Sequence, residues 1–307
     1  MSARLLVLGW HNVTATPGFP AAPGAAERGF EQQMRALART AHVLALEDAL
    51  ARLYAGERLP SRSVVITFDD GYRDNLAIAV PVLERLGLPA TFFLVPRLLS
   101  GELGAWWETL GWAIGARTRD TLSWDGEAFA LHSEDERKRT YSTLARAMKR
   151  LDHEAREQAM TGIVESLEPQ GAEPQLFMNW EGARELVARG FSVQSHTCSH
   201  FVLAREPPAR QLRELADSRA QLESALGISI STIAYPYGGP AEYSKDSVAA
   251  AREAGYRWAL TTREGFATRA TPPLEVRRCV MYPERGIVDL LAQLRYLLQS
   301  RLSGARG

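Results

Sequence analysis

The sequence predicts an α/β fold that is either layered or closed into a barrel. Short apolar segments of strand length alternate with amphipathic segments of helix length through most of the 307 residues. The strand-like segments are apolar on both faces, as is typical of strands covered by helices. Because each helix follows one strand and precedes the next, we expect parallel strands. An α/β barrel commonly occupies about 250 residues, so we interpret residues 1–307 as one domain.

Six segments have the composition of buried strands: RLLVLGW, SVVITFDD, ATFFLV, GFSVQSH, ISTIAYPYG and RWALTT. The segments between them have helical periodicity. In FEQQMRALART, Phe30, Met34 and Leu37 form one apolar stripe. DNLAIAVPVLERLG and PARQLRELADSRAQLESALG are predicted helices that end at Gly87 and Gly227.

Residues from about 101 to 177 interrupt this alternation. The segment is highly charged and helical in period, and we expect it to have no strand of its own. We therefore interpret it as a helical insertion within the single domain. Near the C-terminus, the leucine-rich GIVDLLAQLRYLLQS is predicted to be a helix packed on the barrel, although its pattern also suits a dimer contact.

The composition excludes several kinds of partner. Lys plus Arg and Asp plus Glu each total 36, so the formal net charge is zero and no global field favours nucleic acid. No stretch approaches the roughly 18 apolar residues of a membrane-spanning helix. The short apolar run at the N-terminus has no clean cleavage site, so we interpret it as a strand and expect a cytoplasmic protein. Two cysteines, Cys198 and Cys279, are too few for a disulfide framework.

Two adjacent carboxylates, Asp69 and Asp70, follow the second predicted strand. Side chains alternate across a strand, so the two acids should diverge and acquire different neighbours and different pKa values. That arrangement permits a division of labour between them. The same Asp-Asp-Gly sequence also suits an ordinary turn.

SHTCSH places His196 and His200 four residues apart after an apolar strand. If the segment turns helically, both imidazoles lie on one face, as two ligands of one metal do. One carboxylate of the Asp pair would complete a three-residue ligand set and leave positions open for water. Cys198 should point away from the two histidines, and we expect a packed thiol there.

AYPYGG contains a proline between two tyrosines, Tyr235 and Tyr237. Pro236 restricts the residue before it to extended geometry, and the glycine after Tyr237 permits a sharp turn. The backbone N–H of Tyr237 can then be left unpaired and directed into a site, although a plain strand-to-loop corner has the same pattern.

TFDDG, SHTCSH and YPYG resemble, in the same order, the first three motifs of the NodB-type polysaccharide deacetylases, carbohydrate esterase family four. PVLERLGLPATFFLV and RELVARGFSVQSHTCSH extend the resemblance. It implies an irregular (β/α) barrel with the helical insertion over or beside its carboxyl-terminal face. It also implies a divalent metal, usually Zn²⁺, on Asp70, His196 and His200. By the same resemblance, Asp69 is the general base and the Tyr237 backbone N–H stabilises the oxyanion.

The sequence departs from this family at the third motif. Many relatives have an Arg two residues before the motif proline, where it orients the catalytic Asp, and here that position is Ala234. Arg277 or Arg278, in EVRRCVMYP, is a candidate to replace it. The residues alone do not choose between the two arginines.

The second departure concerns the general acid. Many relatives carry a C-terminal His for this role, but this chain has no histidine after His200. GWHNV resembles the N-terminal strand of circularly permuted relatives such as the poly-N-acetylglucosamine deacetylases, and this resemblance assigns the role to His11. His132 and His153 lie in the charged insertion and are predicted to be solvated.

Aromatic residues are candidates for sugar contacts, although most tryptophans are packing residues. Helical spacing explains the AWWETLGW cluster equally well. The residues that we expect to contact substrate are Tyr235, Pro236, Arg278 and Trp180, with Trp106 and Trp107 as further candidates at the rim.

We therefore expect a metal-dependent hydrolase that removes N-acetyl, or less favourably O-acetyl, groups from a glycan, glycolipid or polysaccharide intermediate. A metal amidohydrolase acting on a non-sugar amide would use the same groups. A degenerate carbohydrate-binding relative could also lack the motif Arg and the C-terminal His, but it would have no need to retain both Asp69 and Asp70. An iron oxygenase fits less well because its usual His-x-Asp pairing is absent.

Overall fold

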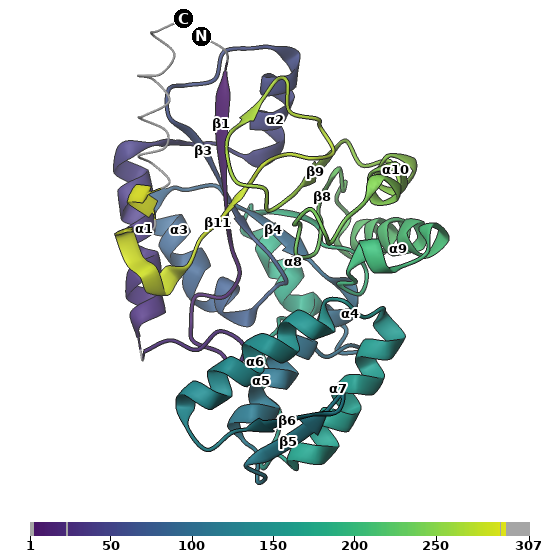
Figure 1. Cartoon of the computed structure of the whole chain (residues 1–307). Helices are drawn as coiled ribbons and strands as arrows, with labels where there is room; N and C mark the ends of the chain where they lie inside the picture. The colour runs from purple at the N-terminus through teal and green to yellow at the C-terminus, as the bar shows by residue number, and fades with distance from the viewer. Residues whose placement is uncertain (1–2, 23, 289, 293–307) are drawn as a thin grey trace, which may run out of the picture.

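A computed structural model of the chain describes residues 3–22, 24–288 and 290–292. Within them, one curled sheet has the order β10-β1-β3-β4-β7-β8-β9, with β2 paired to β3 and β11 to β1 (Figure 1). All of its pairings are parallel except that of β10. The strands are β1 Arg4–Trp10, β2 His42–Val43, β3 Ser63–Phe68, β4 Thr91–Leu94, β7 Ser192–Ser195, β8 Thr232–Ala234, β9 Trp258–Leu260, β10 Ala267–Thr268 and β11 Cys279–Val280.

The segment from Val276 to β11 links the two edges of the curled sheet. Val276 forms a parallel bridge with Leu260 of β9, and Cys279 of β11 pairs with Leu8 of β1. The sheet is therefore drawn into an irregular barrel, as the sequence predicted.

Helices cover the outside of the barrel. Phe30, Met34 and Leu37 of α1 are buried against the sheet, as their spacing predicted. Gly87 and Gly227 end their helices with φ of 63° and 66°, in the left-handed region that favours glycine. The helices of the barrel are α1 Ala25–Thr40, α2 Leu46–Ala55, α3 Val80–Leu86 after a π-helical segment Asn75–Ala79, α4 Pro96–Leu99, α8 Trp180–Ala188, α9 Pro208–Leu226 and α10 Lys245–Glu253, with 3₁₀ turns at Leu203–Arg205 and Pro283–Arg285.

The barrel interior is filled by side chains that converge from different strands. Leu5 and Val7 of β1, Phe93 of β4 and Leu260 of β9 are fully buried in one cluster, which Leu50 of α2 joins. The alternate residues of β1 face the covering helices in a second cluster. Burial of both faces explains why the strand sequences are continuously apolar.

The predicted insertion is a layer with its own core at the end of the sheet to which β1 runs (Figure 1). Its helices are α5 Trp106–Gly115, α6 Glu134–Met148 and α7 His153–Leu167. The expectation that it contains no strand was wrong, because β5 Thr121–Trp124 and β6 Glu127–Ala130 form an antiparallel hairpin between α5 and α6. Asp125 and Gly126, at φ of 51° and 77°, make the turn that joins them.

In the described part of the chain, no helix combines the length and apolarity needed to cross a membrane. The predicted C-terminal helix GIVDLLAQLRYLLQS lies largely outside the described residues. Its packing therefore stays a prediction.

Candidate active site and metal centre

The residues singled out in the sequence follow the carboxyl ends of neighbouring parallel strands. His11 follows β1, Asp69 and Asp70 follow β3, His196 follows β7, and Tyr237 lies in the loop after β8. Because parallel strands end on the same side of a barrel, these five residues converge on one region.

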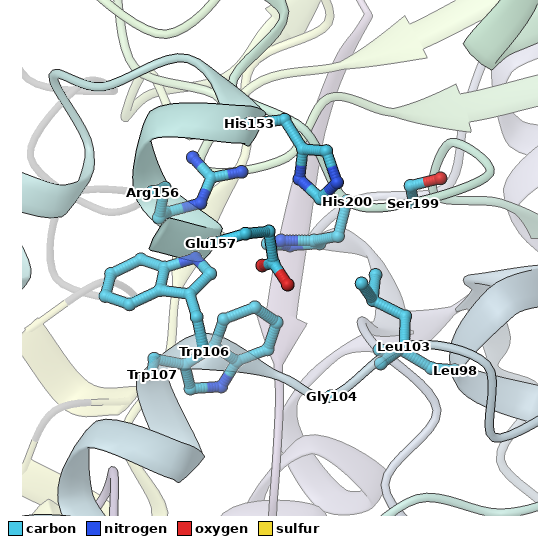
Figure 2. A pocket seen from close by; sticks show the side chains of 10 residues that line it. All are labelled: Leu98, Leu103, Gly104, Trp106, Trp107, His153, Arg156, Glu157, Ser199 and His200. Atoms are coloured by element: carbon cyan, nitrogen blue, oxygen red, sulfur yellow. The ribbon is translucent and has the colours of Figure 1, made fainter. Parts of the chain in front are cut away.

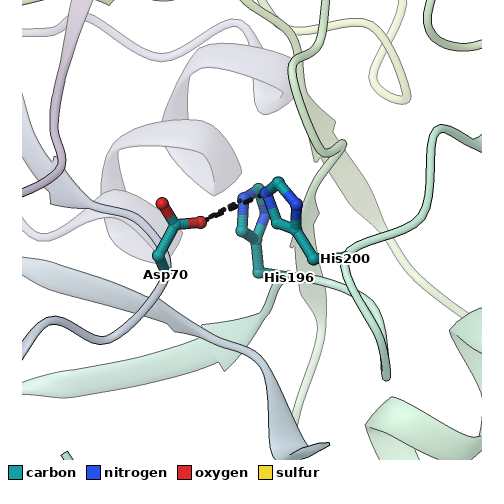
Figure 3. Close-up of side chains that lie close together, drawn as sticks. All are labelled: Asp70, His196 and His200. Atoms are coloured by element: carbon teal, nitrogen blue, oxygen red, sulfur yellow. Dashed lines mark ion pairs between the residues drawn. The ribbon is translucent and has the colours of Figure 1, made fainter. Parts of the chain in front are cut away.

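Asp70, His196 and His200 form a buried cluster (Figure 3). Asp70 Oδ1 lies 3.3 Å from His196 Nε2 and 3.2 Å from His200 Nε2, and the ligand atoms all lie within 4.8 Å of one another. Although buried, Asp70 Oδ1 has no hydrogen-bond partner among the described residues. Burial raises the pKa of Asp70, but the two imidazoles outweigh it and hold the pKa well below its usual range. A divalent cation fits this donor set.

The histidine loop is not helical, contrary to our expectation. Thr197 and His200 adopt φ of 65° and 54°, and the Thr197 hydroxyl accepts a hydrogen bond from the His200 backbone N–H at 3.0 Å. Positive φ is rare for a β-branched residue, so this reversal is imposed by its surroundings. It brings the imidazoles together, with ring centroids 4.9 Å apart. Cys198 between them is buried as a packed thiol, and burial raises its pKa to about 11.

One histidine is oriented by a backbone carbonyl. His196 Nδ1 lies 2.7 Å from the carbonyl oxygen of Ala234, so a proton on Nδ1 leaves Nε2 free to bind a metal. Ala234 is the position where relatives have the motif Arg, and here its methyl group is buried in the barrel core.

Arg278 supplies the cation missing at Ala234. Its Nη1 and Nη2 donate to Asp69 Oδ1 and Oδ2 at 2.6 Å each, and both side chains are buried. Burial raises the pKa of Asp69, but the positive charges of Arg278 and His196 outweigh it and lower that pKa. Arg277 is exposed and donates to the carbonyl of Glu264 instead. The Nη atoms of Arg278 are thus occupied by Asp69, and its contact with substrate stays a prediction.

Asp70 and Tyr237 are each the central residue of a tight three-residue turn. Gly71 N–H donates to Asp69 O at 2.9 Å across Asp70, and Gly238 N–H donates to Pro236 O at 2.7 Å across Tyr237. The central residues have φ of 70° and 61°, the strained form of the γ-turn. Among the described residues, no protein acceptor takes the backbone N–H of Tyr237.

His11 is half-buried at the end of β1. Its ring stacks on Phe19 with centroids 6.0 Å apart, and its carbonyl accepts from Asn75 Nδ2 at 2.7 Å. Burial raises the pKa of Asp69 and of Asp70, and nearby positive charges lower it. His11 makes the smallest of these lowering contributions at both carboxylates. The imidazole thus lies within electrostatic range of both carboxylates.

Three residues predicted to contact substrate lie elsewhere. Tyr235 is fully buried, stacks on Tyr243 with centroids 5.0 Å apart and donates its hydroxyl to Leu274 O at 3.2 Å. Trp180 packs partly buried against the barrel core from the start of α8. Pro236 is buried within the turn that it helps to form. Tyr235 and Pro236 are buried and Trp180 is partly exposed, so contact of these residues with a sugar stays a prediction.

The two rim tryptophans, by contrast, lie beside the cluster. The Trp107 ring lies 4.6 Å from that of His200, and Trp106 Nε1 donates to the Tyr237 hydroxyl at 2.8 Å. Both belong to α5, so the insertion covers the metal centre. They are also buried in the core of the insertion, which explains the helical packing pattern noted above.

The insertion contributes residues that we did not predict. His132 is exposed as expected, but the solvated placement of His153 was wrong. His153 is half-buried against Phe201, with ring centroids 4.2 Å apart, and burial lowers its pKa to about 4. Arg156, one turn along α7, is almost fully buried. Only the i, i+3 spacing of the two residues could have indicated a shared inward face.

A buried carboxylate also ties the insertion to the barrel. Glu108 of α5 accepts hydrogen bonds from the Thr16 hydroxyl, the Gly18 N–H and the Tyr72 hydroxyl at 2.7 to 2.8 Å. Burial raises the pKa of Glu108. Gly18 precedes Phe19, so Glu108 fixes the loop that packs on His11.

The fold and the cluster define a class of protein: a parallel α/β barrel that presents acids and imidazoles at the carboxyl ends of its strands. Residues 56–259 match the family model described as polysaccharide deacetylase, and the chain belongs to that family. This match confirms the predicted family and its NodB-type barrel. Family membership supports deacetylation of a carbohydrate as the activity.

Individual relatives agree with this family. YxkH of Bacillus subtilis, whose name assigns it to the polysaccharide deacetylases, is 24% identical over 268 residues, 87% of this chain and 67% of YxkH. Among solved structures, the deacetylase PplD of Streptococcus pyogenes matches with a TM-score of 0.63 and 19% identity, covering 95% of this chain and 99% of PplD. IcaB of Ammonifex degensii matches with a TM-score of 0.56 and 21% identity, covering 95% and 97%. At these identities, the structural matches show a shared fold.

Proposed function

We propose that the protein is a divalent-metal-dependent hydrolase, with Zn²⁺ as the favoured metal, that removes N-acetyl groups, or less favourably O-acetyl groups, from a glycan or glycolipid. One observation carries the proposal. Asp70 Oδ1 is buried between two imidazole nitrogens at 3.2 and 3.3 Å without a hydrogen-bond partner in the described part of the chain. An ionised carboxylate is stable in such a place when a cation completes it.

The two adjacent acids then have separate tasks. Asp70, with His196 and His200, would hold the metal, which when bound supplies Lewis acidity toward a water molecule and the acetamide carbonyl. Asp69 is engaged by Arg278 and faces the same centre, with Oδ2 3.9 Å from His196 Nε2. Its lowered pKa keeps it ionised at neutral pH, so it can accept a proton from the attacking water.

Other residues act on the substrate as the amide breaks. The unpaired backbone N–H of Tyr237 is available to the negative charge that develops on the carbonyl oxygen, a role in which one donor contributes about 3 kcal/mol. His11 would donate the proton that the leaving amine requires. The stacked ring of Phe19 holds the His11 imidazole in place.

The first test is acetate release from short N-acetylglucosamine oligomers by zinc-loaded protein. Asp69→Asn should retain zinc and lose activity by about 10²- to 10⁴-fold, the usual contribution of a general base. Asp70→Asn should instead lose zinc. His11→Ala should retain zinc and lose activity to a similar degree as Asp69→Asn.

Two results would contradict the proposal. If the zinc-loaded protein releases no acetate from any acetylated glycan or glycolipid offered, the activity is not deacetylation of a sugar. If Asp70→Asn retains wild-type zinc content, the metal is bound elsewhere. Zinc content measured on every variant separates loss of the metal from loss of the base.

A further inference from the structure

An arginine of the insertion is buried without a counter-ion. Arg156 of α7 is 2% exposed, and its Nε and Nη1 have no hydrogen-bond partner among the described residues. No salt bridge to its guanidinium occurs in that part of the chain. Its guanidinium lies near the ring of Trp106, with Cζ 5.9 Å from the ring centroid. An arginine stays charged at any physiological pH, so this placement is unfavourable for the folded protein on its own.

Arg156 lines a pocket that reaches the metal centre (Figure 2). The pocket lies between α7 and the tryptophans of α5, and His200 and Ser199 form its inner wall. His200 is also a residue of the metal cluster. An anion paired with Arg156 would therefore lie next to the group on which the metal acts.

The other pocket residues leave the charge of Arg156 uncompensated. His153 is held neutral at physiological pH, because burial and the nearby arginines lower its pKa to about 4. Glu157 lines the same pocket, but it is exposed and lies outside salt-bridge distance of Arg156. The pocket thus contains one buried guanidinium that no carboxylate of the described residues pairs with, and the Glu157 carboxylate lines the pocket without reaching it.

A second cation of the insertion lies nearby. Lys149, the residue that follows α6, places Nζ 4.8 Å from the centroid of the Tyr237 ring, and that centroid lies 4.9 Å from the centroid of the His200 ring. Within the described residues, Lys149 has no salt-bridge partner. Trp106, whose ring Arg156 contacts, donates to the Tyr237 hydroxyl, so the two cations contact the same pair of aromatic side chains.

We propose that Arg156 and Lys149 form an anion-binding subsite beside the metal centre that takes a carboxylate or phosphate carried by the acetylated glycan. The inference rests on the proposed deacetylase function and names its substrate class as an acidic sugar. A guanidinium has the planar donor geometry that matches both oxyanions. A neutral glycan would leave Arg156 unpaired.

The test is binding of three trisaccharides to the full-length zinc-loaded protein by calorimetry. They are neutral tri-N-acetylchitotriose, the same sugar with one 6-phosphate, and the same sugar with one lactyl ether that adds a carboxylate. We expect the wild type to bind at least one anionic sugar on the order of 10- to 100-fold more tightly than the neutral one, the range of a charge-assisted hydrogen bond. The anionic sugar that shows the gain identifies the group.

Variants assign the preference to Arg156. Arg156→Gln should lose it, and Arg156→Lys should retain part of it. Arg146→Gln removes the same charge from an exposed position on α6 and should leave the preference intact. Equal affinity of the wild type for neutral and anionic sugars would overturn the subsite, and so would an unchanged preference in Arg156→Gln.

Two further measurements separate the possible explanations. Because Arg156 has no internal partner, Arg156→Gln should unfold at the same or a higher temperature than the wild type. A large fall in this temperature with the anionic preference unchanged would show a structural arginine. Acetate release is measured on the same sugars: an anionic preference without acetate release contradicts the deacetylase function alone, and acetate release without the preference overturns the subsite alone.

Discussion

Replacing Arg278 with glutamine tests whether the pair with Asp69 sustains catalysis. Both guanidinium–carboxylate distances are 2.6 Å, and both side chains are 1 to 3% exposed. Removing one partner of a buried ion pair costs about 3–5 kcal/mol, because the other charge is left uncompensated. Glutamine can still offer one N–H to Asp69, so we expect a loss at the lower end, about 3 kcal/mol of unfolding free energy.

The same substitution should slow catalysis more than it weakens metal binding. Asp69 would lose the fork that fixes both of its oxygens, and a displacement of about 1 Å at a catalytic group commonly costs on the order of 10²-fold in rate. Among the described residues, Asp70 forms no hydrogen bond or salt bridge with Arg278, so zinc should stay bound. The assays are urea unfolding, acetate release and zinc content of the purified variant.

Arg277→Gln is the matched control, because this neighbouring arginine is exposed and, within the described residues, its side chain donates to the Glu264 carbonyl alone. It should match the wild type in all three assays. The reasoning is refuted if Arg278→Gln also retains wild-type stability and acetate release. It is refuted as well if the two variants lose activity equally.

Three further substitutions test other parts of the structure. Glu108→Gln replaces one of the two accepting oxygens with an NH₂ group, so either the Gly18 N–H or the Thr16 and Tyr72 hydroxyls lose their acceptor. It should lower the unfolding free energy measured in urea by roughly 1–3 kcal/mol, and an unchanged midpoint would contradict it. His153 has a pKa of about 4 in the folded protein, below the usual ~6.5, so the unfolded chain binds its proton first as the pH falls. The neutral His153 therefore contributes fully to the unfolding free energy above pH 6.5, and this contribution is lost as the pH falls to 4. Discounted for partial exposure, this loss is about 1–2 kcal/mol, and His153→Gln should remove it from the pH profile of thermal unfolding. Gly238 has a φ of 60°, and a Cβ added there would lie 2.7 Å from a backbone nitrogen, so Gly238→Ala should lower the unfolding free energy by more than about 1–2 kcal/mol. Gly162→Ala, on the open face of α7, should instead raise it. Equal unfolding midpoints for the two variants would refute the strain argument.

The location of the site could be predicted because it depends on topology. Asp69, Asp70 and His196 each follow an apolar strand, and parallel strands deliver such residues to one edge whatever the details of the loops. The local geometry was wrong where it depended on the loop itself. His196 and His200 approach each other through positive φ at Thr197 and His200, and no propensity indicates that conformation for a threonine.

The sequence also did not predict which residues distant in the chain lie together in the fold. Arg277 and Arg278 are adjacent and chemically identical, and only the alternation of side chains along the segment beside β1 decides which one enters the barrel. Arg156 was not predicted because it lies in a segment rich in Arg and Glu, where a charged side chain normally faces solvent. The face that a helix turns inward depends on the element against which it packs, and the charge pattern of α7 does not predict which element that is.

Several unfavourable features of the described structure lie around the metal centre. Asp70 and Tyr237 occupy strained turns at φ of 70° and 61°, and Arg156 is a buried charge without an internal partner. Positive φ costs a non-glycine residue roughly 1–2 kcal/mol, so these residues lower stability where they stand. They come from two different sources, since the strained turns belong to the barrel and the unpaired arginine to the insertion. If the barrel sets the chemistry and the insertion selects the substrate, changes in α6 and α7 should alter which glycan is deacetylated while Asp69, Asp70 and the two histidines continue to determine whether it is.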